Sequence, residues 1–171
     1  MKAPILSLLF VASTAYAMPA DQDPTQLEVS SPAFNAHQEI PAEFTCEGEG
    51  TAPALNWSKP PAGTRSVAIL VEDTDAPNGA FTHWLVTGIS PQTTHLAKGG
   101  ALPAGSFAAS NDKGKIGYAG PCPSDGATHH YHFHVYALDT KLEKRMTKAA
   151  FTSAIQGHVL AQGELVGTYQ K

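Results

Sequence analysis

The sequence predicts a mainly β domain of the α+β class, built from several antiparallel strands with one or two helices. Residues 66–71 read SVAILV, are apolar on both faces, and predict a central strand buried on both sides. Residues 81–89 read FTHWLVTGI and predict the next strand, after a turn-prone segment at 75–79. Residues 129–138 predict a third long strand, and a capped helix can follow it.

The remaining predicted elements are shorter or less regular. We expect a first strand near residues 27–30, and a long ordered loop with at most short strands at 91–114, which is rich in Gly, Ala, Ser and Pro. Thr147 can cap a helix that Gly163 ends, with one face formed by Phe151, Ile155, His158 and Val159. Gly157 inside it would cost about 1 kcal/mol relative to alanine. A last strand is expected at 164–169.

The first 17 residues have the pattern of a secretory signal peptide. A short apolar stretch at 5–12 precedes Ala15-Tyr16-Ala17, an A-x-A cleavage site, and the stretch is too short to span a membrane. We expect cleavage after Ala17, a flexible mature N-terminus at 18–26, and a single domain at 27–171. The protein is therefore expected in the periplasm or outside the cell, with no transmembrane anchor after cleavage.

Charge and cysteine content indicate which partners are disfavoured and whether the cysteines are paired. The formal net charge is −4, and loss of Lys2 with the leader makes it more negative, which argues against nucleic acid or an anionic membrane as partner. Cys46 and Cys122 are the two cysteines of the chain, and an exported protein favours a disulfide between them. The alternative is a reactive thiol at Cys122 beside His129.

The richest segment is 117–136, where a Gly/Pro-rich loop leads into a strand with four histidines. Alternation predicts that one face of this strand carries His129, Tyr131, Phe133 and Val135. The first two residues of that face are polar and the last two are apolar, as expected if the strand starts at the rim of a pocket and then enters the core. The other face carries His130, His132, His134 and Tyr136. Because same-face histidines on one strand converge poorly on an ion, we expect a solvated face there, with a metal site at His130, His132 and His134 as the alternative.

Three separated motifs resemble those of the phosphatidylethanolamine-binding protein family, in its bacterial Raf-kinase-inhibitor-like branch. They are Asp73-Thr74-Asp75-Ala76-Pro77, Thr82-His83-Trp84, and the segment from Gly120-Pro121-Cys122-Pro123 to His129-His130-Tyr131. Further matching segments extend the resemblance over residues 27–169. The resemblance implies an antiparallel β-sandwich-like fold with a C-terminal helix. Thr74 replaces a family proline, and His130 replaces a family arginine near the rim.

The resemblance also implies a ligand pocket lined by Asp73, Asp75, His83, Gly120, Pro121, His129 and Tyr131. Imidazoles, a phenol and loop amides can hold a phosphate or carboxylate without any lysine. We expect Asp73 to hold His83 through its second ring nitrogen, which would fix the tautomer and favour the charged ring.

These observations predict a non-enzymatic binding protein for a small anion of the phosphate or phospho-head-group type, with no cofactor. The resemblance adds a possible role as inhibitor or modulator of a partner protein, such as a kinase or hydrolase. The oligomeric state is left as monomer or homodimer. The alternatives are a periplasmic metal binder that uses the histidine-rich strand, and a hydrolase. The hydrolase is disfavoured because the chain has no Gly-x-Ser-x-Gly elbow, and Ser110 and Ser124 lack a nucleophile context.

Overall fold

The structure is a computed structural model, and it describes residues 24–99, 102–142 and 144–171. The signal peptide predicted at 1–17, and most of the N-terminal segment predicted at 18–26, lie outside the described residues. Within the described ranges, no helix is both long and apolar enough to cross a membrane.

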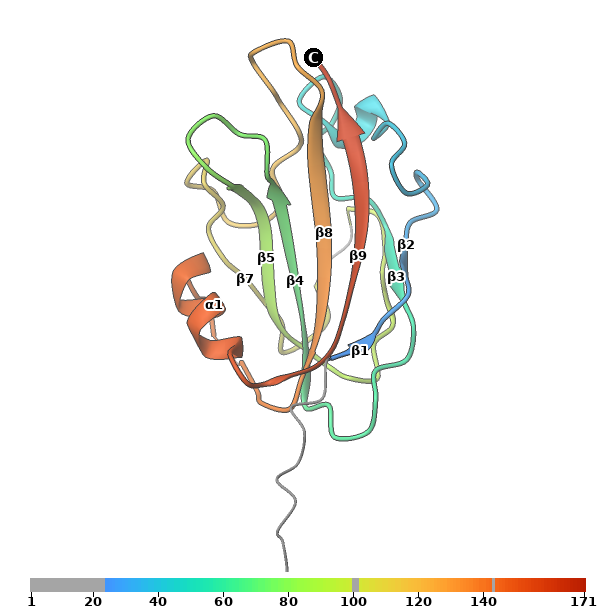
Figure 1. Cartoon of the computed structure of the whole chain (residues 1–171), viewed down its shortest axis with the longest axis vertical. Coiled ribbons are helices and arrows are strands. Elements are labelled where there is room, and N and C mark those ends of the chain that lie inside the picture. The colour runs from blue at the N-terminus through green and yellow to red at the C-terminus, as the bar shows by residue number, and fades with distance from the viewer. Residues whose placement is uncertain (1–23, 100–101, 143) are drawn as a thin grey trace, which may run out of the picture.

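A six-stranded sheet forms the larger layer, with its strands in the order β1-β9-β8-β4-β5-β7 (Figure 1). Its four long strands are β4 (Ser66–Asp73), β5 (Phe81–Ile89), β8 (His129–Leu138) and β9 (Val159–Tyr169). Two short strands, β1 (Thr25–Gln26) and β7 (Phe107–Ala108), lie at its edges. The central strand β4 is buried along nearly its whole length, as the SVAILV run predicts. The prediction for 81–89 is also confirmed.

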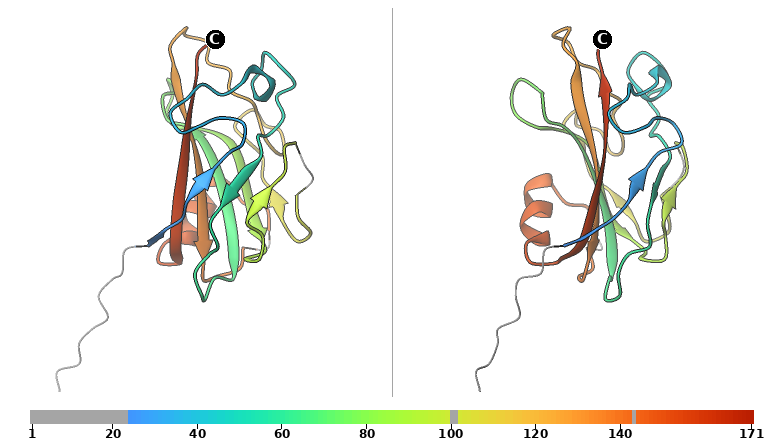
Figure 2. Two further views of the ribbon diagram at one scale, coloured as in Figure 1. Left: turned by 90° about the vertical axis from the view of Figure 1, so that its right-hand side faces the viewer. Right: turned by 45° about the vertical axis from the view of Figure 1, so that its right-hand side comes forward.

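The second layer is a three-stranded sheet in the order β2-β3-β6, from β2 (Val29–Ser30), β3 (Leu55–Trp57) and β6 (His95–Leu96). It covers one face of the larger sheet (Figure 2). The main core lies between the two layers and includes Phe133 and Val135 from β8 together with Leu55 and Trp57 from β3. A short 3-10 helix, η1 (Ala42–Phe44), lies near one end of this layer. The expected mainly β, sandwich-like fold is therefore confirmed.

Helix α1 (Lys148–Ile155) packs on the opposite face of the larger sheet, where Phe151 is fully buried in a second apolar cluster (Figure 2). Thr147 caps it as predicted, because its side chain accepts a hydrogen bond from the backbone N–H of Ala150. The predicted end at Gly163 is wrong. The helix ends at Ile155, Gly157 adopts a left-handed φ of 74°, and the chain enters β9 at Val159.

Gly163 lies inside β9, which is therefore longer than the strand predicted at 164–169. A side chain at this position would collide with the carbonyl oxygen of Leu27, so the glycine permits a close approach of the chain that enters the domain. That approach also places β1 parallel to β9, with Thr25 opposite Ala161. Ordered structure thus begins before residue 27. The strand predicted near 27–30 corresponds to β2, whereas β1, whose polar sequence carries no strand pattern, was not predicted.

Cys46 and Cys122 form a disulfide with a Cα–Cα distance of 5.4 Å, which confirms the predicted pairing. The alternative of a reactive Cys122 thiol is excluded in this structure. The backbone reinforces the link, since the N–H of Cys46 donates to the carbonyl oxygen of Pro121 at 3.0 Å. The bridge therefore fastens the segment after η1 to the loop that precedes β8.

We expect replacement of both cysteines by alanine to lower the free energy of unfolding by about 2–5 kcal/mol, because the bridge closes a long loop in the unfolded chain. The cysteines are 76 positions apart. Denaturant titration of the wild type and the double variant measures this difference. Wild-type protein that has been reduced and alkylated should match the variant. Equal midpoints for oxidised wild type and variant would contradict the prediction.

Candidate functional site

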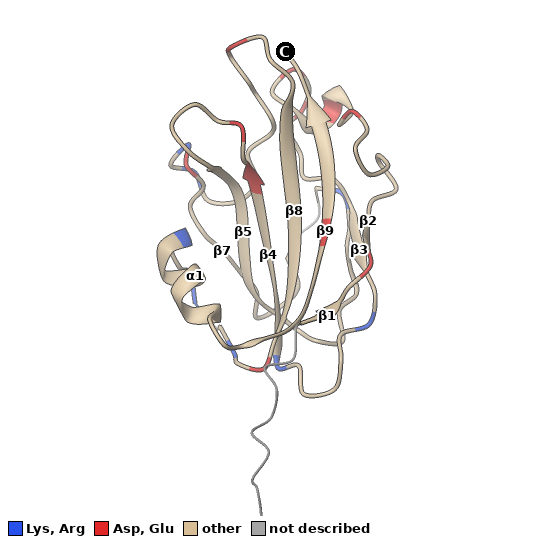
Figure 3. Cartoon of the chain, viewed as in Figure 1, with Lys and Arg blue, Asp and Glu red and all other residues tan. Residues whose placement is uncertain are grey.

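A pocket of about 150 Å³ opens at the end of the larger sheet where β4 ends and where β5 and β8 begin. Asp73 closes β4, His83 lies near the start of β5, and His129 is the first residue of β8. Acidic segments gather at this end of the molecule (Figure 3). The lining residues are Asp73, Ala76, Pro77, Phe81, His83, Lys113, Cys122, Pro123, Ser124, Asp125 and His129.

His129 lies between two carboxylates. Its Nδ1 is 2.7 Å from Oδ2 of Asp73, and its Nε2 is 3.1 Å from Oδ2 of Asp125. Desolvation disfavours a charge on this buried ring, but the hydrogen bonds and charges of the two carboxylates together outweigh it and raise the pKa of His129. Because a carboxylate can only accept, both contacts are satisfied as hydrogen bonds when both ring nitrogens donate, which is the imidazolium form.

His83 has a different environment. Its Nδ1 lies 2.6 Å from the carbonyl oxygen of Ala119, and the backbone N–H of Ala119 donates to the carbonyl oxygen of His83 at 2.9 Å. Burial lowers the pKa of His83, so the ring is neutral near pH 7. Its Nδ1 donates to the carbonyl, which leaves Nε2 as an acceptor.

The expected pairing of Asp73 with His83 is therefore wrong. Asp73 holds His129 instead, and the carbonyl of Ala119 holds His83. Asp73 lies opposite Tyr131 in the register of β4 and β8, two residues from His129. The sequence places Asp73 near both histidines, but strand register and loop position decide which ring it contacts.

Asp75 and Tyr131 lie beside the pocket and not among its lining residues. The Asp75 carboxylate accepts from the backbone N–H of His130 at 2.8 Å and contacts its Nδ1 at 2.7 Å. Tyr131 is fully buried, with its ring edge-on to His83. Burial and the nearby Asp73 carboxylate raise the pKa of Tyr131, so its hydroxyl stays protonated. Among the described residues, no group has good hydrogen-bond geometry to that hydroxyl.

Gly120 and Pro121 shape the loop behind the pocket. A side chain at Gly120 would come within 2.7 Å of the carbonyl oxygen of Phe44, so glycine is required by the close approach of the η1 segment. Pro121 accepts the backbone hydrogen bond from Cys46. These two residues therefore position Cys122 and the residues after it, which do line the pocket.

Of the predicted pocket residues, Asp73, His83 and His129 line the pocket. The prediction did not assign the other lining residues to it: Ala76, Pro77, Cys122 and Pro123, which lie in the motifs, and Phe81, Lys113, Ser124 and Asp125. Lys113 follows Asn111, whose buried amide donates to the carbonyl oxygen of Gly117 and whose side-chain oxygen accepts from the backbone of Lys113. Asn111-Asp112 carries a turn signal, but the distance from this turn to the pocket is set by the tertiary fold alone. Asp125 lies four residues before His129 in the Gly/Pro-rich loop. This nearness along the chain is the signal that could have placed its carboxylate beside the ring.

The chain matches the family model of phosphatidylethanolamine-binding proteins over residues 30–170. A UPF0098 protein from Methanothermobacter thermautotrophicus is 40% identical over 151 residues, which cover 85% of this chain and 99% of that protein. A Mycobacterium tuberculosis protein named as lipoprotein LppC is 41% identical over 147 residues, 84% of this chain and 72% of that protein.

Two crystal structures are also similar. The phosphatidylethanolamine-binding protein homologue CT736 from Chlamydia trachomatis superposes with a TM-score of 0.80 at 37% identity, covering 86% of this chain and 99% of that chain. E. coli YbcL, described as a member of the mammalian PEBP family, gives a TM-score of 0.79 at 31% identity, with coverages of 85% and 98%.

The chain is a two-layer β domain, and polar side chains from the ends of neighbouring strands of its larger sheet form a pocket. With these matches, the chain belongs to the phosphatidylethanolamine-binding protein family. The motifs around Asp73, His83 and His129 had indicated the same family.

We expect Asp73→Asn to lower the pKa of His129, because the substitution removes the charge that faces Nδ1. The pKa of His83 should fall less, since Asp73 acts on that ring only through its charge. Titration of the imidazole NMR signals measures both values. Asp139→Asn, which alters the separate His158–Asp139 pair, is the matched control and should leave both rings unchanged. A larger shift at His83 than at His129 would contradict this assignment.

Proposed function

We propose that this protein is a non-enzymatic binding protein that takes a small ligand with anionic oxygens, of the phosphate or phospho-head-group type. The observation that carries the proposal is the Nε2 of His129, which lines the pocket and already contacts a carboxylate, that of Asp125. An oxyanion of the ligand would replace this carboxylate on the same N–H group. Charge-assisted hydrogen bonds of this kind are among the strong ones in proteins.

The neighbouring groups favour a ligand with both anionic and donor groups. Lys113 adds a second positive charge to the pocket wall, and His83 offers an acceptor at Nε2. A phosphate that keeps one hydroxyl, or a head group with an ammonium, supplies a donor for that acceptor. Asp73 stays bound to Nδ1 of His129 and keeps the ring charged.

The volume supports a small ligand. At about 150 Å³ the pocket is smaller than the roughly 300–1,000 Å³ of sites that enclose drug-sized molecules. It fits a phosphate or a short head group, whereas acyl chains would remain outside.

The contacts of His129 argue against the hydrolase alternative. Asp73 and His129 are arranged as two members of a Ser-His-Asp triad, and Ser124 also lines the pocket. The contacts of Nε2, however, are with both oxygens of Asp125, and among the described residues no hydrogen bond joins Ser124 to the ring. A nucleophilic serine needs that bond, so we infer binding without turnover.

Export fits this proposal. The disulfide suits an oxidising compartment, and the relative LppC carries the name of a lipoprotein. We infer that the protein acts in the periplasm or outside the cell. A role as inhibitor or modulator of a partner protein is compatible with a pocket rim that such a partner could contact.

We expect inorganic phosphate to bind the wild type, and His129→Gln to weaken this binding by about ten- to a hundredfold, since one charge-assisted donor is lost. Measured at acidic pH, where the His129 ring is protonated in both proteins, Asp125→Asn should tighten it by about two- to fivefold, because a partly exposed competing charge is removed. Isothermal titration calorimetry measures both effects. His158→Gln and Asp139→Asn are the matched controls. Wild-type affinity in His129→Gln would refute the pocket.

Binding should weaken as pH rises. His129 carries its charge below its raised pKa and loses it above, so affinity should be highest below the ordinary histidine pKa of about 6.5 and fall as pH passes through the raised value. A phosphodiester head group is the suitable probe, because its single charge is constant over this range. Equal affinity at pH 6 and pH 9 would contradict a role for the charged ring.

A further inference from the structure

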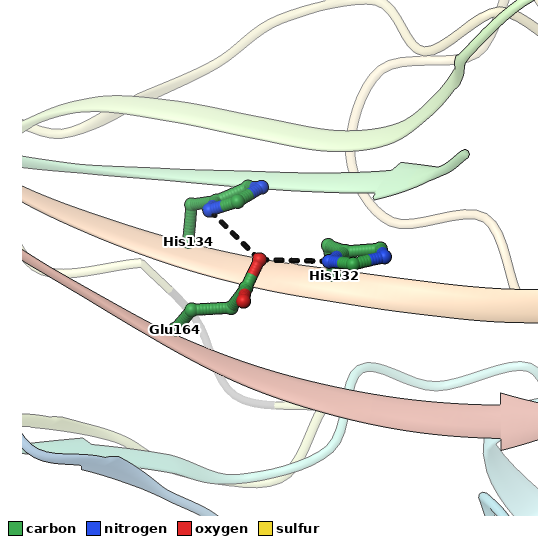
Figure 4. A group of neighbouring side chains, drawn as sticks. All are labelled: His132, His134 and Glu164. Carbon is green, nitrogen blue, oxygen red and sulfur yellow. Dashed lines mark hydrogen bonds and ion pairs between the residues drawn. The ribbon is translucent and has the colours of Figure 1, made fainter. Parts of the chain in front are cut away.

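The outer face of β8 carries a second cluster of polar side chains, separate from the pocket. His132 and His134 point from β8 toward Glu164 of β9 (Figure 4). Nδ1 of His132 is 2.7 Å and Nδ1 of His134 is 3.4 Å from the same carboxylate oxygen, Oε1 of Glu164. Both imidazoles therefore direct the same nitrogen toward one point.

Strand register brings these three groups together. Glu164 lies directly opposite His134 in the antiparallel pairing of β8 with β9, and His132 lies two residues further along the same face. The sequence argued against a metal site because histidines on one strand converge poorly on an ion. The carboxylate from the neighbouring strand removes that objection, because it supplies a ligand from a second element.

The ligand set differs from the one that the sequence offered. His130, the first histidine of the alternative metal site that the sequence suggested, contacts Asp75 and is not part of this cluster. The side chains of His132 and His134 are only 24% and 26% exposed, and their rings stack at 5.9 Å with an interplanar angle of 16°. These two rings are therefore partly buried, whereas His130 on the same face is 49% exposed.

We propose that His132, His134 and Glu164 form a binding site for a divalent transition metal ion, with Zn²⁺ as the best match. Two imidazoles and one carboxylate are a ligand set that zinc uses where three protein groups bind and a fourth position stays open. The ligand atoms lie within 4.8 Å of one another. Tetrahedral coordination at zinc distances needs separations of about 3.3 Å, which small side-chain rotations supply.

Charges of both signs surround the site. Glu72 of β4 lies opposite His132, so a carboxylate flanks the histidine pair on each neighbouring strand. Lys148 of α1 forms an ion pair with Glu72 and is the cation that faces the site from the helix.

The test is calorimetric titration of Zn²⁺ into protein purified without a histidine tag and stripped with a chelator. We expect one equivalent to bind, and each of His132→Gln, His134→Gln and Glu164→Gln to weaken binding by about tenfold or more, since loss of an outer-shell partner alone typically costs ten- to a hundredfold. In NMR spectra, Zn²⁺ should perturb the imidazole signals of His132 and His134 and leave that of His129 in place.

Two control variants separate this site from general surface binding. His130→Gln tests the alternative metal site suggested by the sequence, and His158→Gln tests an exposed histidine that also contacts a carboxylate. Both should bind Zn²⁺ like the wild type. The proposal is overturned if Zn²⁺ does not bind with one-to-one stoichiometry, if Glu164→Gln binds unchanged, or if His130→Gln weakens binding as much as His134→Gln. Thermal unfolding of each variant shows whether the fold is retained.

Discussion

The pairing of β4 with β8 is the constraint on which both polar sites depend. Eight consecutive residue pairs, from Ser66 opposite Leu138 to Asp73 opposite Tyr131, join the two strands at the centre of the larger sheet. β4 is buried on both faces, so a shift of one residue would move its apolar side chains out of register with the layers above and below. This register is what brings Asp73 to His129 and Glu72 to His132.

The alternation along β8 then separates two kinds of chemistry. Odd-numbered positions face the inner core and begin with His129 at the pocket, whereas His132 and His134 face away from it. On the inner side carboxylates contact both nitrogens of the imidazole, which favours its charged form. On the outer side two rings share one carboxylate. One strand therefore presents histidine as a cationic donor on one face and as a pair of potential metal ligands on the other.

Much of this arrangement could be predicted from the sequence. The long strands follow from their hydrophobic patterns, and the two faces of β8 follow from simple alternation. The roles of single groups could not be predicted, because they depend on contacts between distant segments. Whether Asp73 holds His83 or His129 is decided by the position of the Ala119 carbonyl, and Glu164 becomes a partner of His132 and His134 only through pairing of β8 with β9.

The misplaced helix end has a similar cause. The apolar spacing of Phe151, Ile155 and Val159 fits a helix equally well when the last of these residues belongs to a strand. The left-handed turn at Gly157 and the contact of Gly163 with Leu27 decide the boundary. A local sequence pattern contains no information about a contact with a segment more than a hundred residues away.

The disulfide between Cys46 and Cys122 makes the structure of the pocket wall depend on oxidation of the two thiols. Cys122 is itself part of the pocket wall, and its partner belongs to a segment that enters the fold much earlier along the chain. The chain must therefore dock that early segment and undergo oxidation before this covalent link holds the wall in place. Formation of the disulfide and completion of the pocket wall are thus one event.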